Sequence, residues 1–209
     1  MAPNGIFLTV QGEGALSGLP MVFVRLAGCS IGCPQCDTDY SLDAKKSVKE
    51  IVSTVASLAG TTVDWVWITG GEPTYLDLQP LIDQLYSVGL RVALATAGTR
   101  SVKKGRYYEV VNGKSVWNAG YDFVSVSPHR VDESFVQRRG DQVNLVFGLN
   151  DLTPQECEPV REELEKGFTH CWVTPCDGRP ETLDWCLEWV YSNRNWRLNA
   201  QAHKMWHLP

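Results

Sequence analysis

The chain has 209 residues, 44% of them hydrophobic, which is enough for one sizeable core, and we expect residues 1–209 to form a single domain. Its 19 Lys and Arg against 24 Asp and Glu give a net charge of -5, which disfavours a dedicated nucleic-acid binder. No apolar run is long enough to cross a bilayer, and residues 1–5 lack the features of a signal peptide, so we expect a cytoplasmic protein without a membrane partner.

Strand-like and helix-like patterns alternate along the chain. Capping residues mark helix starts at Ser47, Asp77 and Thr153. After an opening segment at 6–10, strands are predicted at 21–26, 63–69, 91–96, 123–127, 143–147, 170–174 and 196–201, and helices at 48–58, 81–88, 153–166 and 182–193. This alternation predicts an α/β fold, which we expect to be an open or partial (βα) barrel of about six parallel strands with ligands at their carboxyl ends.

One segment interrupts this alternation. Residues 106–117 place Asn112-Gly113 between two strand-like runs, which is the pattern of a two-residue turn and predicts an inserted β-hairpin. A lid, a dimer contact and a decoration of the fold are all compatible with this pattern.

The seven cysteines fall into two groups. Cys157, Cys171, Cys176 and Cys186 are scattered through predicted helices and strands, where we expect them to pack in the core. Cys29, Cys33 and Cys36 lie together in a Gly- and Pro-containing loop directly after the first predicted strand, which suits a metal site. A structural zinc ion normally takes four ligands, whereas a cluster with three protein ligands leaves one metal open for a substrate. Zinc binding and oxidation sensing stay open as alternatives.

The order of these motifs resembles the radical S-adenosylmethionine (SAM) superfamily. Cys29-x3-Cys33-x2-Cys36 has that superfamily's spacing, and Thr69-Gly-Gly-Glu-Pro73 at the end of a predicted strand resembles its Gly-Gly-Glu-Pro motif. The two glycines would let backbone approach a ligand, and Glu72 could accept hydrogen bonds from the ammonium group of SAM. An ordinary strand-to-helix turn would have the same composition.

Three further features resemble the 7-carboxy-7-deazaguanine synthase family, and together they span nearly the whole chain. The first is Gln11-Gly-Glu-Gly14. The second is the segment Phe23–Gly28 before the cysteines together with Cys36-Asp37-Thr38 at their end, and the third is Gln201-Ala-His-Lys204 shortly before Pro209. The resemblance implies conversion of 6-carboxy-5,6,7,8-tetrahydropterin to 7-carboxy-7-deazaguanine with loss of ammonia, in queuosine-type 7-deazapurine biosynthesis. It implies a 4Fe-4S cluster, SAM and Mg²⁺ as cofactors, with a SAM-derived radical that abstracts hydrogen from the substrate.

The resemblance also implies roles for individual residues. Cys29, Cys33 and Cys36 would hold the cluster, and Thr38 would bind magnesium. Glu13, Arg25 and Thr69 are the candidate catalytic residues, and the substrate would also contact Val10, Gln11, Gly12, His203 and Pro209. SAM would lie among Gln35, Cys36, Asp37, Gly71, Glu72, Ser127, Pro128, His129, Thr174, Pro175, Cys176 and Asp177.

The chain departs from the family pattern at four places. Family members often have Lys at His129, a Glu-Thr-Asn-Gly-like run at 95–98, Gln at Thr174 and Lys near Asn144. Two of these positions, His129 and Thr174, are among the SAM contacts that the resemblance implies.

Two other functions are considered beside this one. A glycyl-radical activase would share the cysteine spacing, and a non-catalytic zinc-binding module would explain the cysteines without any reaction. The resemblance further implies an electron donor such as a flavodoxin and a homodimer. Near the carboxyl end lie Trp185, Trp189, Trp196 and Trp206, which would suit a buried interface, although aromatic residues in helices more often pack in the core.

Overall fold

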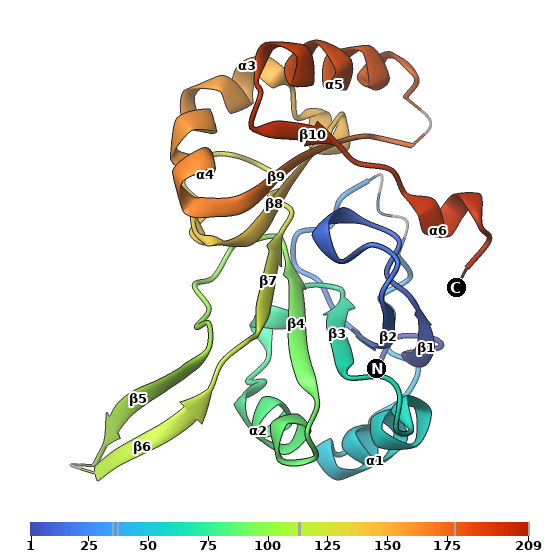
Figure 1. The fold of residues 1–209 in the computed structure, drawn as a ribbon, viewed down its shortest axis with the longest axis vertical. Coiled ribbons are helices and arrows are strands. Elements are labelled where there is room, and N and C mark those ends of the chain that lie inside the picture. Colours follow the sequence, from blue (N-terminus) through green and yellow to red (C-terminus); the bar gives the residue numbers. More distant parts are fainter. Residues whose placement is uncertain (35, 37, 113, 178, 209) are drawn as a thin grey trace.

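The computed structural model describes residues 1–34, 36, 38–112, 114–177 and 179–208. Its centre is one eight-stranded sheet (Figure 1). Along the sheet the strands are β1 (Ile6–Val10), β2 (Pro20–Leu26), β3 (Trp65–Gly70), β4 (Arg91–Thr96), β7 (Phe123–Val126), β8 (Gly140–Phe147), β9 (Phe168–Pro175) and β10 (Trp196–Leu198). Strand β1 pairs antiparallel with β2, and all other neighbours are parallel. The α/β partial barrel is therefore confirmed, with seven parallel strands where about six were predicted.

The helices follow the predicted alternation, with one exception. The confirmed helices are α1 (Val48–Ala59), α2 (Gln79–Ser87) and α5 (Glu181–Ser192). The single helix predicted at 153–166 is instead α3 (Pro154–Cys157), the 3₁₀ turn η4 (Glu158–Val160) and α4 (Arg161–Gly167). Pro159 explains the break, because proline has no N–H to donate and its ring crowds the preceding turn.

The predicted caps are present, with one shifted by a residue. Ser47 with Glu50, and Thr153 with Glu156, each form a reciprocal capping box. Asp77 does accept the Gln79 N–H at 3.1 Å, although the last residue before α2 is Leu78. Four short elements were not predicted: the 3₁₀ turns η1 (Gly14–Leu16), η2 (Pro73–Tyr75) and η3 (Leu149–Asp151), and helix α6 (Ala202–Met205).

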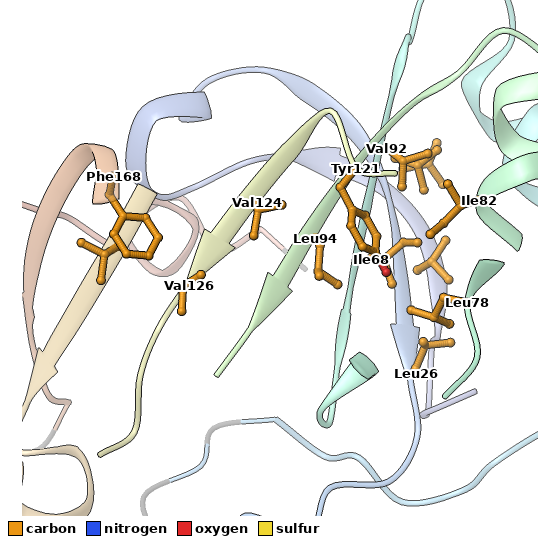
Figure 2. Packing of buried hydrophobic residues seen from close by; sticks show 14 of the residues in the cluster. Leu26, Ile68, Leu78, Ile82, Val92, Leu94, Tyr121, Val124, Val126 and Phe168 are labelled. Carbon is orange, nitrogen blue, oxygen red and sulfur yellow. The ribbon is translucent and has the colours of Figure 1, made fainter. Parts of the chain in front are cut away.

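The main core lies between one face of the sheet and the helices. Figure 2 shows Ile68, Leu94 and Val124, from β3, β4 and β7, grouped with Leu78 and Ile82 beside them. Because side chains alternate along a strand, the residues between these positions face the other side of the sheet. A second apolar cluster occupies that side and comprises Met21, Trp67, Ala93 and Phe123. Arg25 and Thr69, which are register partners on β2 and β3, follow on the same side as this cluster.

The predicted β-hairpin is confirmed and ends two residues later than expected. It consists of β5 (Arg106–Val111) and β6 (Lys114–Ala119), which pair with each other and form a separate two-stranded sheet. Asn112 has a φ of 51°, as a primed turn requires, and Gly113 lies outside the described residues. Figure 1 shows the hairpin projecting away from the main sheet. Gln79 of α2 holds its base through Tyr107 Oη at 3.0 Å and the Ala119 carbonyl at 2.8 Å.

Three of the four scattered cysteines, Cys157, Cys171 and Cys186, pack in the main core, as predicted, whereas Cys176 lies at the wall of the cavity described below. All four are buried, and burial raises the pKa of Cys157, Cys171 and Cys186 to about 12. Within the described residues, the structure contains no helix long and apolar enough to cross a membrane.

A partly buried carboxylate joins α4 to the last strand. Burial by itself would raise the pKa of Glu165, but hydrogen bonds from Asn195, Trp196 and Arg161 outweigh it and lower that pKa below 4.5. The Trp196 indole N–H and the Asn195 amide each donate at 2.8 Å. The charged form of Glu165 therefore contributes to the stability of this edge of the sheet.

Candidate active site

The cysteine loop borders a cavity of about 290 Å³ at the carboxyl ends of the parallel strands. Cys29, Cys33 and Cys36 line it together, and the loop follows β2 directly, as predicted. The strand ends supply the opposite walls, because each parallel strand finishes at the same edge of the sheet. The other predicted residues on its walls are Glu13, Thr38, Thr69, Gly71, Glu72, Ser127, His129, Pro175, Cys176 and Asp177.

Cys33 is the most enclosed of the three cysteines. Its Sγ lies 2.8 Å from His129 Nδ1 and accepts from Asn150 Nδ2 at 3.2 Å. Burial raises the pKa of the Cys33 thiol, the Asn150 hydrogen bond opposes that rise, and the neighbouring Cys36 and Cys29 add to it. The thiols therefore lie near enough to influence one another. No sequence pattern pointed to Asn150, which lies in η3, far from the cysteines along the chain.

This donor set fits an iron-sulfur cluster. Among the described residues, no three metal-binding side chains are already gathered in a coordinating arrangement. The three thiols nevertheless share one cavity, and thiolates are the ligands that such clusters require. Three cysteines would leave one iron open, whereas a structural zinc site needs a fourth ligand.

The two glycines of the Gly-Gly-Glu-Pro motif meet the base of the cysteine loop. A Cβ on Gly71 would lie 1.9 Å from the Gly28 carbonyl oxygen, and one on Gly70 would lie 2.1 Å from that of Leu26. The Gly71 N–H donates to the Leu26 carbonyl at 2.9 Å, and the Glu72 N–H donates to that of Gly28 at 3.0 Å. The two glycines thus allow a close approach to the end of β2 and to the base of the cysteine loop. Both also line the cavity, and their approach to a ligand stays a prediction.

Glu72 joins the ends of β3 and β4. Its side chain is 3% exposed, and its carboxylate accepts from Thr96 Oγ1 and from the Ala97 N–H, both at 2.7 Å. The N–H and the hydroxyl of Thr74 also donate to it, at 3.1 and 2.6 Å. Glu72 also lines the cavity, and its contact with the ammonium group of SAM stays a prediction.

The amino-terminal loop meets the carboxyl-terminal segment beside the cavity. The Ala202 N–H donates to the Gly12 carbonyl at 2.9 Å, and Gln201 Nε2 donates to Glu13 Oε1 at 2.8 Å. A Cβ on Gly12 would lie 2.6 Å from the backbone nitrogen of His203, so only glycine fits this crossing. His203 Nδ1 is 3.8 Å from Glu13 Oε1. Two of the motifs that the sequence analysis connected are thus in direct contact.

Some predicted residues do not reach the cavity walls. The Gln11 side chain is buried and accepts the Glu13 N–H at 3.1 Å, and the Arg25 guanidinium lies over the Phe7 ring, 5.2 Å from its centre. Thr174 is 2% exposed. Seven predicted residues do not line the cavity: Val10, Gln11, Gly12, Arg25, Pro128, Thr174 and His203. Three more lie outside the described residues: Gln35, Asp37 and Pro209.

The structure adds lining residues that the sequence analysis did not assign. Lys204 forms an ion pair with Asp177 across the cavity wall, and Gln201 Oε1 lies 3.0 Å from Lys204 Nζ. Gln201 and Lys204 belong to the carboxyl-terminal motif, which predicts no role for either of them. The remaining lining residues are Ile31, Tyr40, Gly70, Ala95, Thr96, Ala97, Val146 and Leu149. Most of them lie at or just after the end of a predicted strand, and this position is the sequence signal that could have identified them.

The partial barrel, with three cysteines after its first parallel strand and a Gly-Gly-Glu-Pro turn at the end of the next, defines a radical SAM enzyme. No family model matches the chain. A 7-carboxy-7-deazaguanine synthase from Burkholderia multivorans is 31% identical over 229 aligned residues, which cover 100% of this chain and 99% of the relative. The one from Escherichia coli K12 is 30% identical over 223 residues, covering 96% of each.

A solved structure agrees with these relatives. The crystal structure of QueE from Escherichia coli superposes with a TM-score of 0.67 at 26% identity and covers 96% of this chain and 93% of that one. The chain belongs to the 7-carboxy-7-deazaguanine synthase family, whose members are radical SAM lyases. This membership decides against the glycyl-radical activase and the zinc-binding module.

Proposed function

We propose that this chain converts 6-carboxy-5,6,7,8-tetrahydropterin to 7-carboxy-7-deazaguanine and releases ammonia. The observation that carries the proposal is that three cysteines, Glu13 and Thr69 line one cavity although they lie in three separate parts of the sequence. A pterin has a fixed edge of hydrogen-bond donors and acceptors, and Glu13 can accept from its amino groups. Full-length similarity to enzymes named for the product supports the same reaction.

Cys29, Cys33 and Cys36 would hold a 4Fe-4S cluster as thiolates, and SAM would occupy the part of the cavity beside them. When bound, the cluster and SAM supply one-electron chemistry that generates an organic radical able to abstract hydrogen. Thr38 would give one oxygen ligand to Mg²⁺, which takes its remaining oxygens from water and the substrate carboxylate. The cysteine thiols in this cavity suit iron, whereas the hydroxyl of Thr38 suits magnesium.

The protein's part in the reaction is to bind, to orient and to exclude water. Arg25 is the register partner of Thr69 on the same side of the sheet. Its guanidinium lies over the Phe7 ring, and on turning from there toward the cavity it would form paired hydrogen bonds with the substrate carboxylate. Gln201 keeps Glu13 at the cavity wall through the bond to Glu13 Oε1. A carboxylate held in a fixed direction selects for an amino group at one position of the substrate.

We further propose the setting in which this reaction takes place. Residues 1–209 form one radical SAM domain that works in the cytoplasm as a homodimer, with a flavodoxin-type electron donor and without direct contact to nucleic acid. None of the seven cysteines, all of them among the described residues, forms a disulfide bond, which is in keeping with a reducing compartment. Met205 and Trp206 are 71% and 58% exposed, which supports an interface near α6.

The test is an anaerobic reaction of the reconstituted protein with SAM, dithionite, Mg²⁺ and 6-carboxytetrahydropterin, followed by mass spectrometry. The proposal expects 7-carboxy-7-deazaguanine. Formation of 5′-deoxyadenosine and methionine alone would leave the enzyme class intact and show that the substrate is wrong.

A pair of matched variants links the product to the cysteine loop. Cys36→Ala should lose the iron and the product together, because Cys36 lines the cavity. Cys186→Ala is the control, since Cys186 is a buried packing residue in α5, and it should keep both. Equal iron content and activity in the two variants would contradict the ligand assignment.

A further inference from the structure

Polar side chains occupy one face of the sheet on β7, β8 and β9. Val124, Val143 and Val173 point to the main core, so the residues that alternate with them face the other side. Four of these residues are polar, and so is Asn199, which follows β10. All five are at most 6% exposed: Ser125, Gln142, Asn144, Thr174 and Asn199. Buried polar groups are stable only when they are hydrogen-bonded, so their partners show what the layer is for.

The first chain of hydrogen bonds runs from β8 to the amino-terminal loop. Thr174 Oγ1 donates to Asn144 Oδ1 at 2.6 Å and accepts from Asn199 Nδ2 at 3.0 Å. Asn199 Oδ1 then accepts the backbone N–H of Gly14 at 3.0 Å. The Asn199 N–H also donates to the Val173 carbonyl at 2.8 Å, which fixes Asn199 against β9.

The second chain starts one strand further along. Gln142 Nε2 donates to Ser125 Oγ at 2.8 Å, and Gln142 Oε1 accepts the backbone N–H of Ala15 at 2.9 Å. A Cβ on Gly14 would lie 2.4 Å from Gln142 Oε1, and Gly14 has a φ of +66°, so a side chain at this position would push the loop away from Gln142.

Both chains therefore end on consecutive amides at the start of η1. Amides at the start of a helical turn have no partner within the turn, and here two buried side chains supply one each. Glu13 immediately precedes these amides and lines the cavity. The direction of Glu13 is thus set by side chains on the sheet, in addition to its contact with Gln201.

We propose that Asn199 and Gln142, supported by Thr174, Asn144 and Ser125, are positioning residues that hold the Gln11–Gly14 loop at the substrate end of the cavity. Thr174 is central to this assignment. Its hydroxyl uses its single donor on Asn144 and accepts from Asn199, so it has no donor left for SAM and is connected through Asn199 to the substrate loop. The inference deepens the proposed function and rests on it for the identity of the substrate.

The test compares Thr174→Val, which keeps the shape and removes the hydroxyl, with Thr174→Ser, which restores it. In the cluster-loaded enzyme, Thr174→Val should raise the KM for the pterin about tenfold, the scale of one buried hydrogen bond, and leave the KM for SAM unchanged. Thr174→Ser should return the pterin KM to within about twofold of wild type. A rise in the SAM KM with an unchanged pterin KM would place Thr174 at the cofactor and overturn the proposal.

A second measurement does not depend on turnover. Hydrogen exchange of residues 11–16 should accelerate about tenfold in Thr174→Val and in Asn199→Ala, while exchange in α5 stays as in wild type. Unchanged exchange in residues 11–16 would show that the loop is not held from the sheet. If the wild-type enzyme does not turn over the pterin at all, the proposed function fails while the exchange result still decides whether the loop is held.

Discussion

Replacing Gly71 by alanine separates the packing role of the Gly-Gly-Glu-Pro motif from a ligand-binding role. The added Cβ would lie 1.9 Å from the Gly28 carbonyl oxygen and 2.4 Å from its carbon, both of them backbone atoms that cannot rotate away. The turn must then move from the base of the cysteine loop. That movement breaks the two backbone hydrogen bonds from Gly71 to Leu26 and from Glu72 to Gly28.

The expected cost follows from these contacts. Two backbone hydrogen bonds contribute about 1 kcal/mol each, and forcing an extra methyl group into a packed site adds about 1 to 3 kcal/mol. The free energy of unfolding should therefore fall by about 3 to 5 kcal/mol, out of the roughly 5 to 15 kcal/mol that is typical of a domain. Because the cysteine loop loses its anchor, the iron content after reconstitution should fall as well.

Urea unfolding of the cluster-free protein and iron analysis of the reconstituted protein measure the two effects. Gly89→Ala is the matched control: Gly89 has a φ of +84°, but a Cβ there meets no atom within 4 Å. Its cost should be limited to about 1 kcal/mol of backbone strain, with normal iron content. Gly71→Ala protein that unfolds and loads iron like Gly89→Ala would refute the reasoning.

Three further predictions concern stability and reactivity. Glu72→Gln replaces the carboxylate that accepts the Ala97 N–H by an amide, and it should lower the free energy of unfolding, measured in urea, by about 2 kcal/mol. Unchanged stability together with a raised KM for SAM would instead assign the carboxylate to the cofactor. Glu165→Gln should be about 1 to 2 kcal/mol less stable than wild type at neutral pH. This difference in stability should disappear as the pH falls below 4.5, because the hydrogen bonds that lower the pKa of Glu165 stabilise its charged form only. A difference that stays constant with pH would contradict this prediction. In iodoacetamide labelling of the cluster-free protein, followed by peptide mass spectrometry, exposed Cys36 should react early and Cys186 only after unfolding.

Much of the fold could be predicted because local patterns carry it. The apolar spacing after Ser47 specifies a helix with its cap, and Asn112-Gly113 specifies a hairpin turn, each within a few residues of sequence. The predicted helix at 153–166 was wrong in its middle, because the periodicity of the apolar residues continues through Pro159 while the backbone hydrogen bonds do not. The strand predicted at 196–201 is shorter in the structure, β10 (Trp196–Leu198), because its bounds are set by pairing with β9 and not by a local pattern.

The sequence by itself determined the cysteine loop and the order of motifs, since ligand type and spacing are properties of the chain. Only the tertiary structure decided which residues face the cavity. Thr174 ends a strand, as ligand-binding residues often do, yet its hydroxyl is taken by Asn144 and Asn199. Asn150 approaches Cys33 from 117 positions away. Such contacts depend on how distant strands are placed side by side, and no local pattern encodes the direction in which a buried hydrogen-bonding group finds its partner.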